Sequence, residues 1–289
     1  MGLPNDMKSI KQTDPATYAK KSSLGQPTDY QSSYDPQLLH PISRADYRST
    51  IDGFSMASHG NDKWQCFELS WLNIYGLPQV ACATITVDLT TAYIVESKSL
   101  KLYLNSLHNQ CFDSVDEVSA CVEQDLFNVL GQGVSVDIYP STENNFANND
   151  SYQGILLDGL DVRGLTYTRD ARLLVNEDSL PAVENQILHS HLLRSVCPIT
   201  NQPDWGSLTI RYSGPVIQKE GLLRYIVSFR EHDGFHEQCV EQIYSDLMRQ
   251  CQTTHLTVCA QYTRRGGIDI NPIRSNHPAP LPLNRLWRQ

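Results

Sequence analysis

The feature that most limits the possible folds is an internal repeat in the order of predicted elements. In residues 85–138, two segments of alternating apolar and polar residues are followed by a helical pattern and a third alternating segment. Residues 208–262 repeat this order of elements, with an apolar run at 222–229 as the second segment. The two predicted helices also share the letters Cys-Val-Glu-Gln, at 121–124 and 239–242. The same letters in the same element of the same order indicate a duplicated module.

The module predicted from these patterns reads strand, strand, helix, strand. The predicted strands are 85–89, 100–104 and 134–138 in the first half, and 208–212, 222–229 and 256–262 in the second. The predicted helices run from Val115 to Leu126 and from Val240 to Cys251, each with apolar residues on one face. Antiparallel hairpins covered on one face by helices form an α+β fold, which is the class we predict.

Composition divides the chain into four predicted parts. Residues 1–60 are polar and turn-rich and are predicted to be an N-terminal arm, whereas 61–140 form the first module. Residues 141–185, with several asparagines, are predicted to be a linker, and 186–289 form the second module. The chain has no run of about 18 apolar residues and no apolar stretch near Met1, so we expect neither a membrane span nor a signal peptide. A cytoplasmic protein is the expectation.

The charge balance argues against nucleic acid as a partner. The net charge is −9, and an acidic field repels phosphate backbones. A phosphate-bearing small ligand would need local basic clusters, for which Lys98 with Lys101 and Arg264 with Arg265 are candidates. On charge alone, each pair is more simply explained as solvated surface residues.

Two common cofactor signatures are missing from the sequence. The only Gly-x-Gly, at 131–133, lacks the third glycine of a dinucleotide-binding fingerprint, so a nicotinamide cofactor would have to bind by another route. None of the eight cysteines forms a Cys-x-x-Cys pair. Cys251, His255 and Cys259 are spaced loosely like metal ligands, but no second pair accompanies them. Each cysteine is more simply a small buried hydrophobic residue.

Four motifs resemble one family. The octet Glu-Ser-Lys-Ser-Leu-Lys-Leu-Tyr at 96–103 is similar to the signature of the 7-cyano-7-deazaguanine reductases of queuosine biosynthesis. The loop 197–206, the tetrad Phe-His-Glu-Gln at 235–238 and the segment 262–272 resemble the long, two-module form of these enzymes. The similarity extends over nearly the whole chain, from 24 to 288.

The resemblance implies a fold and a reaction. The family reduces the nitrile of 7-cyano-7-deazaguanine to an aminomethyl group with two NADPH, through a covalent thioimide. Attack by a thiolate turns one difficult step into easier ones, because a nitrile carbon is a weak electrophile. The implied architecture is two tandem tunnelling-fold modules, with a homodimer completing the channel. A small deazapurine nitrile, rather than nucleic acid or membrane, is the implied partner.

The resemblance also assigns residues. It makes Cys197 the nucleophile and Asp204 the proton donor, which would require Asp204 to be protonated near neutral pH in a dry pocket. The residues assigned to the substrate are Glu96, Ser97, Lys98, His236 and Glu237. The residues assigned to NADPH are Lys98, Ser99, Arg265 and Gly266, and none is assigned to a metal. We expect Glu237 to be ionised, because the first turn of a helix favours a negative charge.

Three alternatives remain open at the level of sequence. A zinc enzyme similar to GTP cyclohydrolase I would use Cys251, His255 and Cys259. A non-catalytic purine-binding or assembly module would leave Cys197 with a structural role only. A thiol hydrolase of the nitrilase type would release ammonia and need no NADPH.

Overall fold

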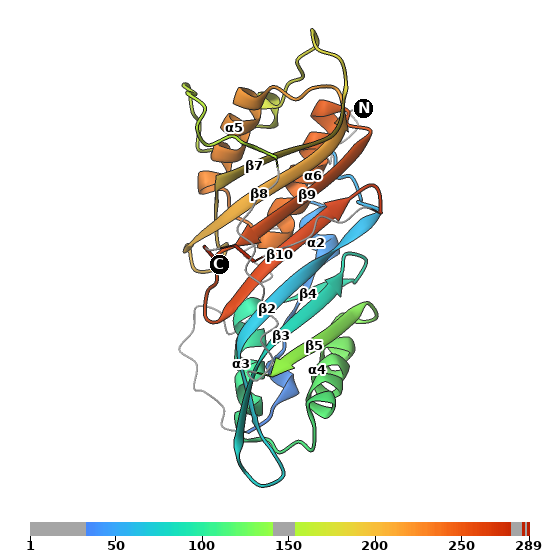
Figure 1. Ribbon diagram of the computed structural model, residues 1–289, viewed down its shortest axis with the longest axis vertical. Coiled ribbons are helices and arrows are strands. Elements are labelled where there is room, and N and C mark those ends of the chain that lie inside the picture. Colours follow the sequence, from blue (N-terminus) through green and yellow to red (C-terminus); the bar gives the residue numbers. More distant parts are fainter. Residues whose placement is uncertain (1–32, 141–153, 279–284, 287) are drawn as a thin grey trace, which may run out of the picture.

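The chain forms one eight-stranded sheet with its helices on one face (Figure 1). The computed structural model describes residues 33–140, 154–278, 285–286 and 288–289, so most of the predicted arm and part of the predicted linker lie outside the described residues. The strand order is β5-β3-β2-β10-β9-β8-β7-β6, and every pair is antiparallel except β6 with β7. The predicted α+β class is confirmed. No helix in the described part of the chain is long and apolar enough to cross a bilayer.

The elements fall into two similar series. The first comprises β1 (Pro41–Ser43), α2 (Arg44–Arg48), β2 (His59–Leu72), β3 (Pro78–Asp88), β4 (Tyr93–Val95), α3 (Ser97–Ser106), α4 (Val115–Leu130) and β5 (Val134–Pro140). The second comprises β6 (Ile155–Leu156), β7 (Val183–Val196), β8 (Pro203–Gly214), α5 (Lys219–Ser228), α6 (His236–Cys251), β9 (His255–Tyr262) and β10 (Ile268–Ser275). Four short 3₁₀ turns are η1 (Pro36–Leu38), η2 (Leu107–Asn109), η3 (Ala171–Leu173) and η4 (Phe229–Glu231).

Two predicted strands are helices. Residues 100–104 belong to α3 and 222–229 to α5 and η4. In α3 the apparent alternation was misleading, because Tyr103, counted as polar, is completely buried. In α5 the buried positions are Leu222, Leu223, Tyr225, Ile226 and Phe229, which have the spacing of a helix. Short apolar runs fit both periods, so the prediction failed at these two segments.

The strands that join the two halves were not recognised from the sequence. β2 pairs with β10 over eight residues, from Cys66 opposite Ile268 to His59 opposite Ser275. β7, the longest strand of the second half, begins in the predicted linker. β1 and α2 lie in the predicted arm, where no regular structure was expected. Each half therefore reads strand, strand, helix, helix, strand.

The halves are equivalent, but not through the tetrad that suggested it. The hydroxyl of Tyr103 in α3 donates to Asp125 in α4 at 2.5 Å, and that of Tyr225 in α5 donates to Asp246 in α6 at 2.7 Å. The two aspartates are 121 positions apart in the sequence, whereas the Cys-Val-Glu-Gln tetrads are 118 apart. The tetrads therefore lie almost one helical turn out of register, so the duplication is correct but this argument for it is wrong.

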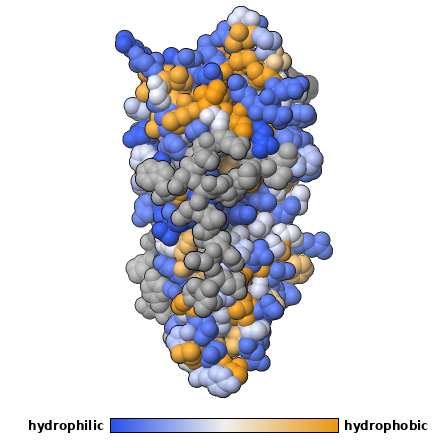
Figure 2. Space-filling model, viewed as in Figure 1, coloured by the Kyte–Doolittle hydropathy of each residue, from blue (hydrophilic) through white to orange (hydrophobic). Residues whose placement is uncertain are grey.

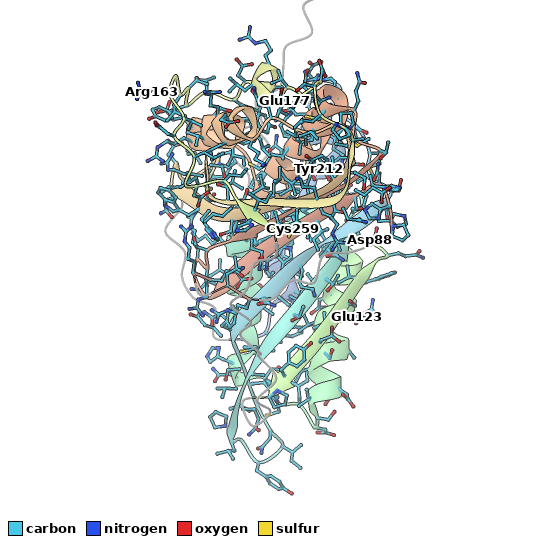
Figure 3. All side chains as sticks on the ribbon, turned by 45° about the horizontal axis from the view of Figure 1, so that its top comes forward. Asp88, Glu123, Arg163, Glu177, Tyr212 and Cys259 are labelled. Atoms are coloured by element: carbon cyan, nitrogen blue, oxygen red, sulfur yellow. The ribbon has the colours of Figure 1, made fainter. Side chains whose placement is uncertain are left out.

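The helices cover two separate hydrophobic clusters, one in each half. The turned view in Figure 3 shows the helices layered on one side of the sheet, with Tyr212 among the side chains on that side. Cys259 is buried with Ile273 in a small separate cluster. Since the sheet is continuous across the two clusters, each half keeps its own core while sharing a rigid support.

A buried ion network joins the halves. Asp62 of β2 accepts hydrogen bonds from Arg44 of α2 at 2.6 Å and from Arg274 of β10 at 2.8 Å. Arg274 also donates to Glu241 of α6 at 2.9 Å, and Glu241 accepts from Arg48 at 2.7 Å. The side chains of Asp62, Arg44 and Arg274 are at most 1% exposed. A charge buried so deeply is tolerated only while its partners remain.

We expect Asp62→Asn to lower the free energy of unfolding by about 3–5 kcal/mol, since it leaves two buried guanidinium groups short of a counter-charge. Chemical denaturation followed by circular dichroism measures this. Asp161→Asn is the control, because Asp161 is 88% exposed and 4.0 Å from Arg163, and it should change stability by less than about 1 kcal/mol. Equal effects of the two substitutions would show that the network contributes little.

Candidate active site

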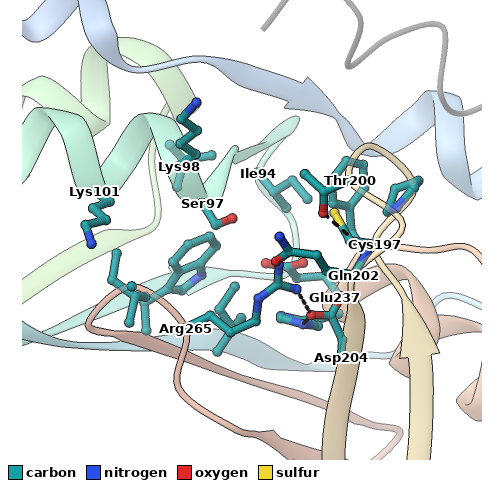
Figure 4. Close-up of a pocket in the computed structure, with 18 of the residues that line it drawn as sticks. Ile94, Ser97, Lys98, Lys101, Cys197, Thr200, Gln202, Asp204, Glu237 and Arg265 are labelled. Atoms are coloured by element: carbon teal, nitrogen blue, oxygen red, sulfur yellow. Dashed lines mark hydrogen bonds and ion pairs between the residues drawn. The ribbon is translucent and has the colours of Figure 1, made fainter. Parts of the chain in front are cut away.

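A cavity of about 590 Å³ lies where the two halves meet (Figure 4). The first half lines it with Trp64 of β2, with β4, and with the start of α3. The second half contributes the β7–β8 turn, the start of α6 and the β9–β10 turn. This volume is typical of a small-molecule site. Of the residues assigned from the sequence, those that line the cavity are Ser97, Lys98, Cys197, Asp204, His236, Glu237, Arg265 and Gly266.

Cys197 is presented by a tight turn between β7 and β8. Its N–H donates to the carbonyl of Gln202 at 2.9 Å, and its carbonyl accepts from the N–H of Asn201 at 3.0 Å. Asn201 has a φ of +54°, a left-handed conformation that asparagine adopts more readily than most residues. The turn is therefore fixed by the backbone, and the half-buried thiol lies at the cavity wall.

Asp204, at the start of β8, is ionised in the ligand-free protein. Burial favours the neutral acid, but the neighbouring His236 and the positive charge of Arg265 outweigh it and hold the pKa of Asp204 below its usual range. The carboxylate Oδ1 accepts from Nη1 of Arg265 and lies 3.5 Å from Nε2 of His236 (Figure 4). The expectation that Asp204 is already protonated near neutral pH is therefore wrong for this state.

His236 is part of the cavity wall. Its ring stacks on that of Tyr262, with centroids 3.9 Å apart and planes 23° apart. Its side chain is only 14% exposed. From the sequence alone a surface histidine was the simpler interpretation, but stacking and the contact with Asp204 fix this imidazole in one orientation.

Glu237, one residue further along α6, is a buried carboxyl with an unused acceptor. Burial, together with the negative charge of Asp62, raises its pKa to about 7. The helix start does not keep it fully ionised, contrary to the sequence-based expectation, because removal from water outweighs the dipole. Within the described residues, Oε1 of Glu237 has no hydrogen-bond partner. An unsatisfied buried acceptor beside a cavity indicates a ligand with a matching N–H donor.

Three cationic side chains, Lys98, Lys101 and Arg265, line the cavity and suit the phosphates of a dinucleotide. Arg265 and Ile268 close a hairpin turn with reciprocal backbone hydrogen bonds of 2.9 and 3.1 Å. Its central residues, Gly266 and Gly267, have φ of +58° and +79°, which glycine adopts without strain. A side chain at position 266 would come within 3.1 Å of Lys101, so glycine lets that lysine approach the turn. Lys98 lines the same cavity.

Two assigned residues, Glu96 and Ser99, are not among the cavity-lining residues. The Glu96 carboxylate accepts from the N–H groups of Lys98 at 2.7 Å and Ser99 at 2.8 Å, capping α3. The Ser99 hydroxyl donates to the Glu96 carbonyl at 2.7 Å and accepts from the His40 N–H at 3.0 Å. Both are 1% exposed, and they fix the helix start that carries Ser97 and Lys98. Their direct roles in binding stay predictions.

The site assignment from the sequence omitted several residues that line the cavity. Lys101 was considered only as a basic pair with Lys98, and Gln202 lies inside a motif already quoted, which was the available signal. Gln202 accepts a hydrogen bond from Nη2 of Arg265 and so shares that guanidinium with Asp204. Trp64 gave no signal, because its strand was not recognised.

The zinc alternative finds no support in the placement of its ligands. Cys251 is buried at the end of α6 and Cys259 is buried in β9, whereas His255 is exposed. In the ranges that the structure describes, no group of three or more His, Cys, Asp or Glu side chains is arranged to hold a metal ion.

Comparison with known proteins agrees with this geometry. Residues 30–138 match the family described as "Nitrile reductase, 7-cyano-7-deazaguanine-reductase N-term", and residues 203–280 match "QueF-like protein". A protein of Paraburkholderia phymatum named NADPH-dependent 7-cyano-7-deazaguanine reductase is 46% identical over 273 residues, which are 93% of this chain and 99% of that protein. A protein of the same name from Burkholderia multivorans is 48% identical over 271 residues, 93% of this chain and 98% of that protein.

We expect Arg265→Gln to raise the pKa of Asp204, because burial then acts with less opposition. Titration of ¹³C-labelled aspartate carboxyls by NMR measures it. Arg264→Gln is the matched control, since the Arg264 guanidinium lies over the Phe67 ring, 4.8 Å from its centroid, rather than on Asp204. An unchanged Asp204 titration in the Arg265 variant would show that the Arg265 guanidinium does not lower the pKa of Asp204.

Proposed function

The chain belongs to the family of NADPH-dependent 7-cyano-7-deazaguanine reductases, and we propose that it performs this reaction at the cavity between its halves. The reaction reduces the nitrile of 7-cyano-7-deazaguanine to the primary amine of 7-aminomethyl-7-deazaguanine with NADPH, in queuosine biosynthesis. One observation supports this cavity as the site. Cys197, in a turn, and Glu237, a buried hydrogen-bond acceptor, both line the same cavity, whose volume suits a small molecule.

Glu237 recognises the guanine-like edge of the substrate. That edge presents a ring N–H and an exocyclic amino group, both donors, and an ionised carboxylate offers only acceptors. Within the described residues, Oε1 of Glu237 is a buried acceptor without a hydrogen-bond partner, so it can take such a donor. His236, fixed by its stack on Tyr262, supplies a neighbouring polar contact.

Cys197 adds across the nitrile, and Asp204 carries the proton. The Cys197 sulfur forms a bond to the nitrile carbon while one carbon–nitrogen π bond breaks, giving a thioimide. The thiol proton must reach the nitrile nitrogen, so no net proton is gained or lost. Because Asp204 begins ionised, it accepts the proton from sulfur and then delivers it to nitrogen. The aspartate is thus a shuttle rather than a pre-protonated acid.

The cations that line the cavity would hold the cofactor. Arg265, Lys98 and Lys101 would pair with its phosphate oxygens, and the backbone of Gly266 permits close approach. When bound, NADPH supplies hydride to the former nitrile carbon. Within the chain, the wall formed by Trp64, Ile268 and Ile270 gives that carbon an apolar surrounding, which limits competing hydrolysis.

We expect a covalent adduct when the nitrile is added without NADPH. The mass of the intact protein should rise by one ligand, because thioimide formation is an addition that releases nothing. Cys197→Ala should abolish the adduct and the nitrile-dependent oxidation of NADPH. Cys111→Ala is the control, since Cys111 is exposed and is not among the cavity-lining residues.

Two outcomes would contradict this assignment. An adduct that persists in Cys197→Ala would place the nucleophile elsewhere. Tight nitrile binding without any NADPH oxidation by the unaltered protein would favour the non-catalytic purine-binding alternative, and release of ammonia would favour the hydrolase.

Nitrile affinity should increase with pH through the pKa of Glu237. Below about 7 this carboxyl is mostly protonated, and binding an N–H edge requires it to lose its proton first. In the Cys197→Ala background, which keeps binding reversible, the dissociation constant should be about tenfold larger at pH 6 than at pH 8. Calorimetry measures it, and Glu237→Gln should bind weakly with little pH dependence. A pH-independent affinity in the Cys197→Ala protein would rule out Glu237 as the recognition carboxylate.

A further inference from the structure

Strands β9 and β10 separate behind the cavity. Within the described residues they pair with each other only at 257–259 and 273–275. β9 nevertheless continues along β8 as far as Tyr262, and β10 begins beside β2 at Ile268. Between these pairs and the β9–β10 turn, the two strands therefore lack the backbone ladder that normally fixes neighbouring strands.

The side-chain amide of Gln289 spans this gap. Its Nε2 donates to the carbonyl of Tyr262 in β9 at 3.3 Å and to Oδ1 of Asn271 in β10 at 2.7 Å. Its Oε1 accepts from Nε2 of Gln261 at 2.9 Å and from the N–H of Leu286 at 3.0 Å. A primary amide has two donor hydrogens and two acceptor lone pairs, so Gln289 uses all of them. The partners also fix the direction of the amide, because a carbonyl only accepts and an N–H only donates.

Gln289 approaches from the face of the sheet away from the helices. Successive side chains of a strand point to opposite faces. Ile268 and Ile270 of β10 line the cavity on the helix side, so Asn271 points to the other face. Figure 1 is viewed from that face and shows the C-terminal end of the chain beside β9 and β10. Hydrophilic residues are common on this face (Figure 2). The Gln289 amide thus supports the cavity wall from behind.

The strand that Gln289 holds carries the surroundings of Asp204. The Tyr262 ring stacks on that of His236, with centroids 3.9 Å apart, and Nε2 of His236 lies 3.5 Å from Oδ1 of Asp204. Just beyond Tyr262 the chain turns and brings Arg265 to the same carboxylate oxygen. A shift of β9 would therefore disturb both partners of Asp204 together.

Asn271 extends this support to β2. Its Nδ2 donates to Oδ1 of Asp269 at 2.7 Å and to the carbonyl of Lys63 in β2 at 3.3 Å. Trp64, the next residue of β2, lines the cavity. Gln289 and Asn271 are 8% and 3% exposed, so these bonds form away from water and each group depends on its partner. Through Asn271, Gln289 therefore acts on the cavity wall of both halves.

The segment that carries Gln289 is itself anchored on both sides. Nη1 of Arg288 donates to the carbonyl of His191 in β7 at 2.9 Å. The Arg285 guanidinium lies over the Phe67 ring of β2, 4.8 Å from its centroid. Because these contacts already order the backbone, the Gln289 amide is placed with little further loss of conformational entropy.

We propose that Gln289 is a positioning residue for the reaction in this cavity. Its amide takes the place of the ladder between β9 and β10, keeps Tyr262 against His236, and keeps the Arg265 turn at Asp204. The proposal rests on the function proposed above, since it concerns the same nucleophile and proton carrier. It differs from a purely structural role, in which Gln289 would affect stability but not the surroundings of Asp204.

Titration of ¹³C-labelled aspartate carboxyls by NMR tests the positioning without any catalysis. Gln289→Ala should raise the pKa of Asp204, because His236 and Arg265 are no longer held against this buried carboxylate. Circular dichroism checks that the variant is folded. An unchanged Asp204 titration in folded Gln289→Ala would overturn the proposal.

Asn276→Ala is the matched control. The Asn276 amide joins the opposite ends of the same two strands, where it accepts from the Leu256 N–H at 2.9 Å and donates to the Thr254 carbonyl at 3.0 Å. Asn276 is not among the cavity-lining residues. Both substitutions should lower the midpoint of chemical denaturation, but only Gln289→Ala should alter the titration of Asp204. An equal shift in both variants would indicate a general loosening of the fold and contradict a specific role for Gln289.

Gln289→Met separates hydrogen bonding from packing. Methionine keeps the length of glutamine, but its thioether donates no hydrogen bond and accepts only weakly. The titration of Asp204 should therefore shift as in Gln289→Ala, and a normal titration would overturn the assignment to the amide. If neither variant folds, Gln261→Ala removes one of the four hydrogen bonds and should raise the pKa of Asp204 to a smaller extent. An unchanged pKa in Gln261→Ala would then count against the proposal.

The rate of Cys197 adduct formation gives a second readout. At saturating nitrile without NADPH, Gln289→Ala should form the adduct about tenfold to a hundredfold more slowly, because the proton carrier is misplaced. The nitrile concentration that gives half the maximal rate should change little, since Glu237 belongs to α6 rather than to β9 or β10. An unaltered rate in Gln289→Ala would overturn the positioning role. Absence of the adduct in the unaltered protein would instead contradict the proposed function, and the Asp204 titration would still decide the role of Gln289.

Discussion

The structure depends on the charge network around Asp62. A carboxylate with no exposure is held by two guanidinium groups, one from the N-terminal helix α2 and one from the last strand, β10. Glu241 extends the network into α6, one helical turn after Glu237. The same charges that join the halves therefore also act on Glu237, which lines the cavity. The negative charge of Asp62 helps to keep Glu237 protonated. The ion network that joins the two halves therefore also influences the protonation of the carboxyl that we propose to bind the substrate.

The chemistry was easier to predict from the sequence than the fold. Cys197, Asp204, His236 and Glu237 came from short motifs with specific residue types, and the structure brings all four to one cavity. Motifs do not report protonation, however. Asp204 was expected to be neutral because burial favours the acid, but the expectation omitted Arg265, which comes from a turn about 60 residues away. Only the three-dimensional arrangement shows that pair.

The errors in secondary structure have one physical origin. The helices α3 and α5 are each only ten residues long, and their buried faces are so wide that apolar residues look continuous or alternating. The prediction missed strands β2 and β10 for the opposite reason. Their polar side chains, such as Asp62 and Asn271, are buried within the pairing between halves, so composition did not mark them as core. A residue pattern read within one module cannot predict the strands that pair between the two modules.

The position of the cavity has a consequence for the behaviour of the protein on dilution. Lys98 and Cys197 come from different halves, but one chain carries both. The encounter of two modules is normally limited by their concentration, whereas here the connecting chain fixes the local concentration of one half beside the other. The cavity should therefore form whenever a single chain folds. Since folding of one chain is a first-order process, formation of the cavity should not depend on the protein concentration.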